Sequence, residues 1–163
     1  MSTEFLIYGA LGLGFASALV GGVFQSFSDF VMKGLALAGD GGAEGMRMLN
    51  RTVFRSVFLT TALGLGPLTI AYAVFAQAHL SPIPGALVLV GTVIYCVFVL
   101  GVTVVGNVPM NERLERLEIG NPQRAAYWGR YHVVWTRWNH LRTFGGAIAA
   151  LCFLNASVLI AGA

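Results

Sequence analysis

Apolar residues fill long stretches of the chain, and the charged residues lie between these stretches. No Asp, Glu, Lys or Arg occurs in residues 5–28, 56–111 or 143–163. A helix that crosses a bilayer needs about 20 consecutive, mostly apolar residues. The first and last stretches hold one such helix each. The middle stretch holds two, separated by a Pro- and Gly-containing turn at residues 79–85. We expect membrane spans at residues 5–24, 53–75, 86–106 and 143–160.

Helical patterning continues beyond these spans. Residues 25–33 extend the first helix, and a glycine-rich turn at 38–42 precedes a helix that starts near Ala43. That helix carries Arg47, Arg51 and Arg55 at every fourth position, a basic stripe suited to anionic lipid headgroups. The third helix continues to about Leu117, and the fourth starts near Pro122. The sequence predicts one all-α domain over residues 1–163, a four-transmembrane-helix bundle with its helices extended on the cytoplasmic side.

Composition and charge support this interpretation. Hydrophobic residues make up 56% of the chain and charged residues only 10%, with a mean hydropathy of +0.74, which leaves too little polar surface for a soluble domain. All ten Lys and Arg residues lie at the first and third connections. The positive-inside rule then predicts a multi-pass protein of the cell (inner) membrane with both termini outside. Because no Lys or Arg precedes the first apolar run, we expect no cleaved signal peptide there.

The few polar residues of the helices gather at one predicted depth, near the cytoplasmic interface. They are Asp29, Asn50, Asn107, Asn111, Asn139 and His140. Asn107 and Asn111 share a helix face at i, i+4 spacing, and Trp128, His132, Trp135 and Asn139 form a stripe on the last helix. We expect Asp29, Asn107, Asn111 and His140 to face the interior, where they would form an aromatic-walled polar pocket.

Each of these residues also has a structural interpretation. Trp and Tyr concentrate at membrane interfaces without any catalytic role, and Asp29 is spaced to pair with Lys33. Ionisable groups near a bilayer are costly and usually functional, so the predicted catalytic residues are His140, His132 and Asp29. The same three are the candidate metal ligands, although His132 and His140 lie too far apart for the usual i, i+4 pair. The cofactor stays open between none and a redox metal such as copper or iron.

Four segments resemble a known family. They are residues 27–32, 46–50, 107–114 and 135–143, of which the Asn-x-Pro-x-Asn and Trp-Asn-His-x-Arg-Thr strings are the most specific. The chain resembles, over nearly its whole length, a family of small four-helix membrane proteins named after the anthrone oxygenases of polyketide pathways. The resemblance implies an oxygenase that uses O₂ to convert a methylene beside a carbonyl, in a polycyclic phenol, to a ketone.

The leading hypothesis is a membrane oxidoreductase for a hydrophobic aromatic substrate, anthrone-like or quinol-like. His140 or His132 would act as base, and Asn107, Asn111 or Asn139 would donate to the enolate oxygen. Trp135 and Trp138 would stack on the substrate ring. Membrane lipids and this small molecule are the expected partners. Nucleic acid is not expected, since no interleaved basic and aromatic pattern occurs. Two alternative functions stay open: a protein that binds lipid, quinone or metal without turnover, and a small transporter that uses Asp29. The oligomeric state also stays open, with a homo-oligomer among the expected partners.

Overall fold

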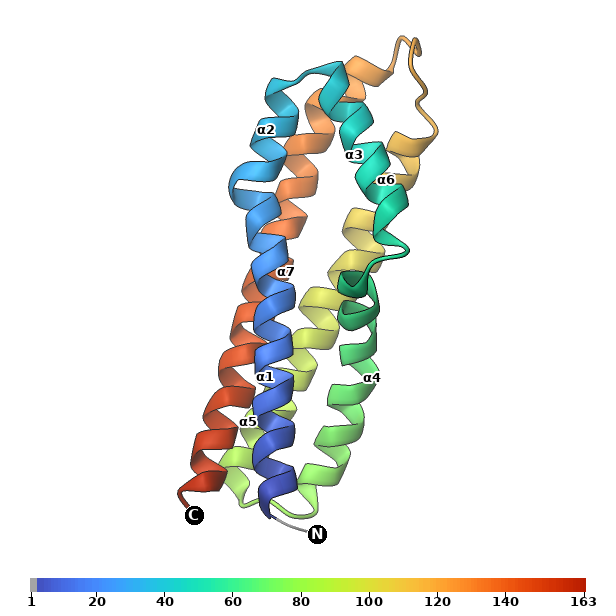
Figure 1. Cartoon of the computed structure of the whole chain (residues 1–163). Coiled ribbons are helices and arrows are strands. Elements are labelled where there is room, and N and C mark those ends of the chain that lie inside the picture. Colours follow the sequence, from blue (N-terminus) through green and yellow to red (C-terminus); the bar gives the residue numbers. More distant parts are fainter. Residues whose placement is uncertain (1–2) are drawn as a thin grey trace.

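The helices form four long runs that pack side by side (Figure 1). The computed structural model describes residues 3–163. The first run is α1 (Thr3–Ser26), the π-helix η1 (Phe27–Val31) and α2 (Met32–Leu37). Next come α3 (Asp40–Val53) and α4 (Val57–Gln77). The third run is α5 (Pro82–Ile94), the π-helices η2 (Tyr95–Gly101) and η3 (Thr103–Asn107), and α6 (Val108–Glu115). The fourth is α7 (Arg124–Ala161). Residues 3–163 contain no strand, so the predicted all-α bundle is confirmed.

Four helical segments are long and apolar enough to cross a membrane. They are Thr3–Leu37, Val57–Gln77, Pro82–Glu115 and Arg124–Ala161. Three of them, at 34 to 38 residues, exceed the about 20 residues that span a bilayer. The surplus lies at one end of the bundle, in α2, α3, α6 and the first turns of α7. We call this part the extended end. The start of α1, the end of α7 and the α4–α5 turn lie at the opposite end (Figure 1).

Small residues let α1 and α7 approach each other closely. A Cβ atom added to Gly146 of α7 would lie 3.0 Å from the Cα atom of Gly21 in α1. Such small-residue contacts are typical of helix packing in lipid, where backbone approach replaces the hydrophobic driving force. The main core follows this crossing and includes Ala10, Ala149 and Phe153, each 0% exposed.

A second core fills the extended end. Its buried members include Met32 of α2, Met46 of α3, Leu114 of α6, and Tyr131 and Trp135 of α7. Residues from all the helices of the extended end therefore share one apolar interior. This interior explains why the helices continue as a bundle beyond the length that a bilayer needs.

The helix boundaries differ from prediction in the second run. We expected one helix from near Ala43 through the span that begins at residue 53, but the helix ends at Val53 and resumes at Val57. Ser56 caps the new helix, because its Oγ accepts a hydrogen bond from the Leu59 backbone N at 3.1 Å. Arg55 therefore lies in the break and not on a helical stripe. The break makes α3 a separate short helix across the extended end.

Candidate active site

A layer of buried polar side chains separates the two cores. Asn139 of α7 is 0% exposed, and its Nδ2 donates to the Phe24 carbonyl at 2.6 Å and to Ser28 Oγ at 2.7 Å. Its Oδ1 accepts a hydrogen bond from Arg142 one turn later. Asn107 is 1% exposed and donates through Nδ2 to the Trp135 carbonyl at 3.2 Å. These contacts tie η1, η3 and α7 together at one level.

π-Helical turns accompany this layer. Ser28 lies in η1, and Thr103 and Asn107 lie in η3. Each π-turn inserts a residue into the regular helical repeat, which redirects side chains and commonly marks functional sites. The polar layer thus coincides with the places where two of the long helices depart from regular α geometry.

The side chain of Asn111 is oriented by two aromatic donors. Its Oδ1 accepts hydrogen bonds from Tyr131 Oη at 2.7 Å and from Trp135 Nε1 at 2.9 Å. An indole N–H can only donate, so the atom that faces Trp135 must be the amide oxygen. The Nδ2 group then points away from both rings. Asn107 and Asn111 both contact Trp135, which confirms that they share one face of their helix.

A cavity of about 750 Å³ lies beside this layer. It is bounded by α3 and α4 on one side and by η2, η3 and α6 on the other, with residues of α1 and α7 between them. The lining is mostly apolar and includes the rings of Phe24, Phe27, Phe54, Phe58 and Trp135. Its polar members include Asn50, Asn111, Glu112 and Arg142. This arrangement, apolar walls with a few polar groups, is typical of a site for a small hydrophobic molecule.

Arg142 is the buried cation of the cavity. It is 6% exposed, and its guanidinium carbon lies 4.3 Å from the centroid of the Phe24 ring and 5.1 Å from that of Trp135. It donates to Asn139 Oδ1 and, at 3.5 Å, to Thr103 Oγ1. Within residues 3–163 no carboxylate forms an ion pair with it, and its Nε has no hydrogen-bond partner there.

The three predicted catalytic residues lie elsewhere. Asp29 and His140 are exposed and His132 is partly exposed, and all three line a groove on the outside of the bundle, between α7 and the η1–α2 segment. The expectation that Asp29 and His140 face the interior is wrong. Asn139 and Arg142 occupy the inner face of α7, and one residue further along a helix turns about 100°, which directs His140 outward. The Asp29 carboxylate lies 3.8 Å from Lys33 Nζ, the pair that the spacing predicted.

The predicted substrate-binding residues divide into two groups. Asn111 and Trp135 line the cavity, whereas Asn107 and Asn139 are buried beside it and bind the backbone of neighbouring helices. Trp138 packs on η3, where a Cβ atom added to Gly106 would lie 2.6 Å from its indole ring. It is not part of the cavity lining.

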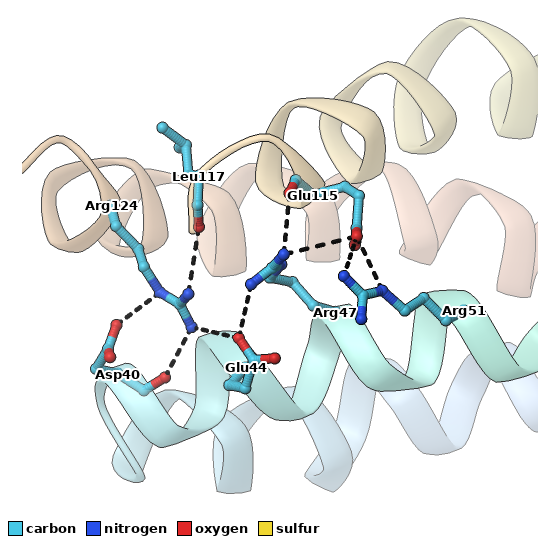
Figure 2. Close-up of polar contacts among 7 residues, drawn as sticks. All are labelled: Asp40, Glu44, Arg47, Arg51, Glu115, Leu117 and Arg124. Carbon is cyan, nitrogen blue, oxygen red and sulfur yellow. Dashed lines mark hydrogen bonds and ion pairs between the residues drawn. The ribbon is translucent and has the colours of Figure 1, made fainter. Parts of the chain in front are cut away.

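A cluster of ion pairs holds α3 in place across the extended end (Figure 2). Arg124, 2% exposed, pairs with Asp40 at 2.7 Å and with Glu44 at 2.9 Å. Glu115 of α6 pairs with Arg47 and with Arg51. The hydrogen bond from Arg124 holds the pKa of Glu44 below its ordinary value of 4.5, and Arg47 adds to this effect while burial opposes it. Arg47 and Arg51 therefore bind a carboxylate and do not form the predicted stripe facing lipid.

The candidate metal ligands do not come together. In the described part of the chain, no three His, Cys, Asp or Glu side chains group as a metal site would require. His132 and His140 are separated by two helical turns along the outer groove, at about 1.5 Å of rise per residue. The residues present do not fit a bound redox metal.

Sequence reasoning missed Arg142 as a site residue. Arg142 enters the sequence analysis through the basic residues that indicate the topology and through the Trp-Asn-His-x-Arg-Thr string that resembles the family, without a predicted role in the site. The available signal was its position: it is three residues after Asn139, so it shares that residue's helix face, and it precedes an apolar span. An arginine placed toward other helices at membrane depth is a functional candidate by default.

The fold and the cavity define a class of protein: a bundle of four helices able to cross a membrane, with a largely apolar cavity between its two cores. The chain belongs to the anthrone oxygenase family, whose model matches residues 47–152. The matched region contains Asn50, Asn111, Trp135 and Arg142 of the cavity but not Asp29. Comparisons with curated proteins and with solved structures gave no match.

Proposed function

We propose that this protein is an oxygenase that acts on a hydrophobic aromatic substrate, anthrone-like or quinol-like, within the cavity. The observation that carries the proposal is the oriented amide of Asn111. Its Oδ1 is occupied by Tyr131 and Trp135, which leaves Nδ2 as a hydrogen-bond donor on the cavity side. Family membership supports oxygenase chemistry, and the aromatic lining supports a planar substrate.

The reaction class sets what the site must do. A methylene beside a carbonyl reacts with O₂ to give a ketone and water, and loss of one methylene proton first yields an enolate. Preorganised donors near the enolate oxygen would stabilise this anion. Asn111 Nδ2 is the proposed neutral donor, and the ring of Trp135 is the proposed stacking surface.

A proton acceptor is also needed. The cavity lining contains two carboxylates, Glu112 and Glu115. Glu115 is engaged by Arg47 and Arg51, whereas Glu112 has only a loose contact with Arg116 at 3.8 Å. We propose Glu112 as the acceptor of the methylene proton. His132 and His140 would take this role only if the substrate bound in the outer groove.

The experiment that tests this proposal compares Asn111→Leu with His140→Ala in purified protein. Removing an oxyanion donor typically lowers turnover by about 10² or more, and a buried donor left without an acceptor costs about 1–3 kcal/mol of stability. We expect Asn111→Leu to abolish most O₂ uptake and ketone formation with an anthrone in the protein that remains folded, and to lower the melting temperature, because Tyr131 and Trp135 lose their acceptor. We expect His140→Ala to retain activity. Loss of turnover in His140→Ala alone would place the site in the outer groove.

We also propose that the extended end lies in the cytoplasm and that the protein resides in the inner membrane. The support is the placement of all ten basic residues at the two connections of that end. In a background without Cys96 and Cys152, a membrane-impermeant thiol reagent should label Ile119→Cys only from the cytoplasmic side. It should label His79→Cys only from the outside. The reverse pattern would contradict this orientation.

A further inference from the structure

Three arginines of this protein are buried, and two of them have carboxylate partners. Arg124 is paired with Asp40 and Glu44, and Arg47 with Glu44 and Glu115. Arg142 is buried to the same degree as Arg47, at 6% exposed, but none of the ion pairs found among residues 3–163 includes it. Burying a charge is costly unless it is paired, so this cation lacks the partner that the other two have.

The contacts of Arg142 leave part of its guanidinium unused. Asn139 Oδ1 and Thr103 Oγ1 accept from the two terminal nitrogens, and both are neutral groups. The Nε donor is buried and bonds to no atom of the described chain. Because Arg142 lines the cavity, a ligand in the cavity can reach it. We therefore expect the ligand to supply the anion that pairs with Arg142.

The surroundings of Arg142 indicate what carries that anion. The guanidinium lies over the rings of Phe24 and Trp135, and both rings line the cavity. Flat aromatic walls favour a planar ring system over a flexible acyl chain, since ring faces can stack. The amide groups of Asn50 and Asn111 line the same cavity and can donate hydrogen bonds to a ligand. Donors of this kind match oxygen atoms.

We propose that Arg142 binds an ionised oxygen, a phenolate or enolate, on a planar aromatic ligand, so that the cavity holds its ligand in the anionic form. The inference rests on the proposed function in using the same cavity, but it does not depend on turnover. Arg142 would then select among hydrophobic ligands: a ring with an acidic hydroxyl or an enolisable carbonyl would bind, and a neutral ring of equal size would bind more weakly.

The test uses a hydroxyanthraquinone as probe, with the full chain in lipid nanodiscs. The probe is already at the quinone level, so its ionisation is read from its visible spectrum whether or not the protein is an oxygenase. We expect the bound probe to ionise at a pH at least about one unit lower than the same probe in empty nanodiscs, which means a tenfold preference for the anion. Its O-methyl ether should bind at least about tenfold more weakly.

Variants of Arg142 complete the test. Arg142→Gln should abolish the shift in the ionisation of the bound probe, and Arg142→Lys should keep most of it because the charge remains. Arg130→Gln is the matched control, since Arg130 is exposed on the same helix and outside the cavity lining. If Arg142→Gln does not fold, the titration of the probe bound to wild type, the affinity of its O-methyl ether and the Arg142→Lys variant still test the proposal.

Two results of the titration would overturn the proposal. A bound wild-type probe that ionises at the same pH as in empty nanodiscs, or higher, would contradict it. So would an Arg142→Gln variant that shifts the probe like wild type. A long-chain fatty acid serves as competitor, and we expect it to displace the probe only weakly. If the fatty acid displaces the probe at a lower concentration than unlabelled hydroxyanthraquinone does, the anion site serves an acyl lipid instead.

Discussion

At the scale of single residues, Arg124 joins the two connections of the extended end. Its guanidinium, on α7, pairs with the carboxylates of Asp40 and Glu44 from α3 and donates to the Leu117 carbonyl from the α6–α7 loop (Figure 2). Charge-assisted hydrogen bonds of this kind have a fixed geometry and are stronger than neutral ones. They hold α3, which lines the cavity through residues such as Met46 and Asn50, against the rest of the bundle.

Glu44 makes this contact dependent on pH. Its pKa in the folded protein lies below the ordinary 4.5, chiefly because of the hydrogen bond from Arg124. Above pH 4.5 the carboxylate is ionised in both folded and unfolded protein, and its stabilisation is complete. As pH falls below that value the unfolded state binds the proton first, so the stabilisation is progressively lost. The melting temperature of wild type should therefore drop more than that of Glu44→Gln between pH 5.5 and pH 3.5, which lie about one unit on either side of 4.5. An equal drop in both proteins would contradict this role of Glu44. Glu118→Gln is the control, because Glu118 is exposed.

The polar residues of the site were largely predictable as a group but not one by one. Spacing places Asn107 and Asn111 on one face and Asn139 on a stripe with Trp135; Asn111 is partly buried and the other three are buried. Spacing did not distinguish Asn139 from His140, because adjacent residues on a helix point about 100° apart and only tertiary contacts decide which one is inside. Here the hydrogen bonds that Asn139 donates to the Phe24 carbonyl and to Ser28 Oγ hold it inside the bundle.

At the scale of helices, hydropathy predicted the four apolar runs and their order. Apolar length is a strong signal because a helix satisfies its own backbone polar groups in lipid and needs a long apolar run to cross it. Two features carried no such signal: the break at residues 54–56 and the π-helical turns. Ser56 caps the helix that follows the break. A serine within an apolar sequence is equally compatible with a continuous helix, so the sequence alone does not reveal the break. The π-turns η1 and η3 hold residues of the polar layer, and this layer forms through contacts between helices, which a single sequence cannot show.

These irregular elements have a consequence for the site. The break separates α3 from α4, and residues on both sides of it, such as Val53 and Phe58, line the cavity. A continuous helix would carry α3 straight on from α4. The ion pairs of Arg124 and Glu115 instead keep α3 across the extended end (Figure 2). There, residues of α3 line one side of the cavity.

At the scale of the whole molecule, the two cores and the polar layer define where a ligand can bind. The main core near the termini is closely packed by small residues, and the second core fills the extended end. The cavity lies where they meet, and its lining includes partly exposed residues of α4 and α6. Leu63 of α4 is one of them, at 50% exposed, which places it at the mouth of the cavity.

The central claim is that a hydrophobic aromatic substrate binds in this cavity, and blocking the mouth tests it directly. Leu63→Trp places an indole at the mouth, whereas Leu68→Trp places one on the same helix, at 59% exposed, outside the lining. Overfilling a packed site typically costs about 1–3 kcal/mol, which corresponds to roughly a tenfold or greater loss of affinity. Equilibrium binding of an anthrone to protein in nanodiscs should weaken about tenfold or more in Leu63→Trp and stay near wild type in Leu68→Trp. Equal binding by both variants and wild type would contradict the cavity as the substrate site.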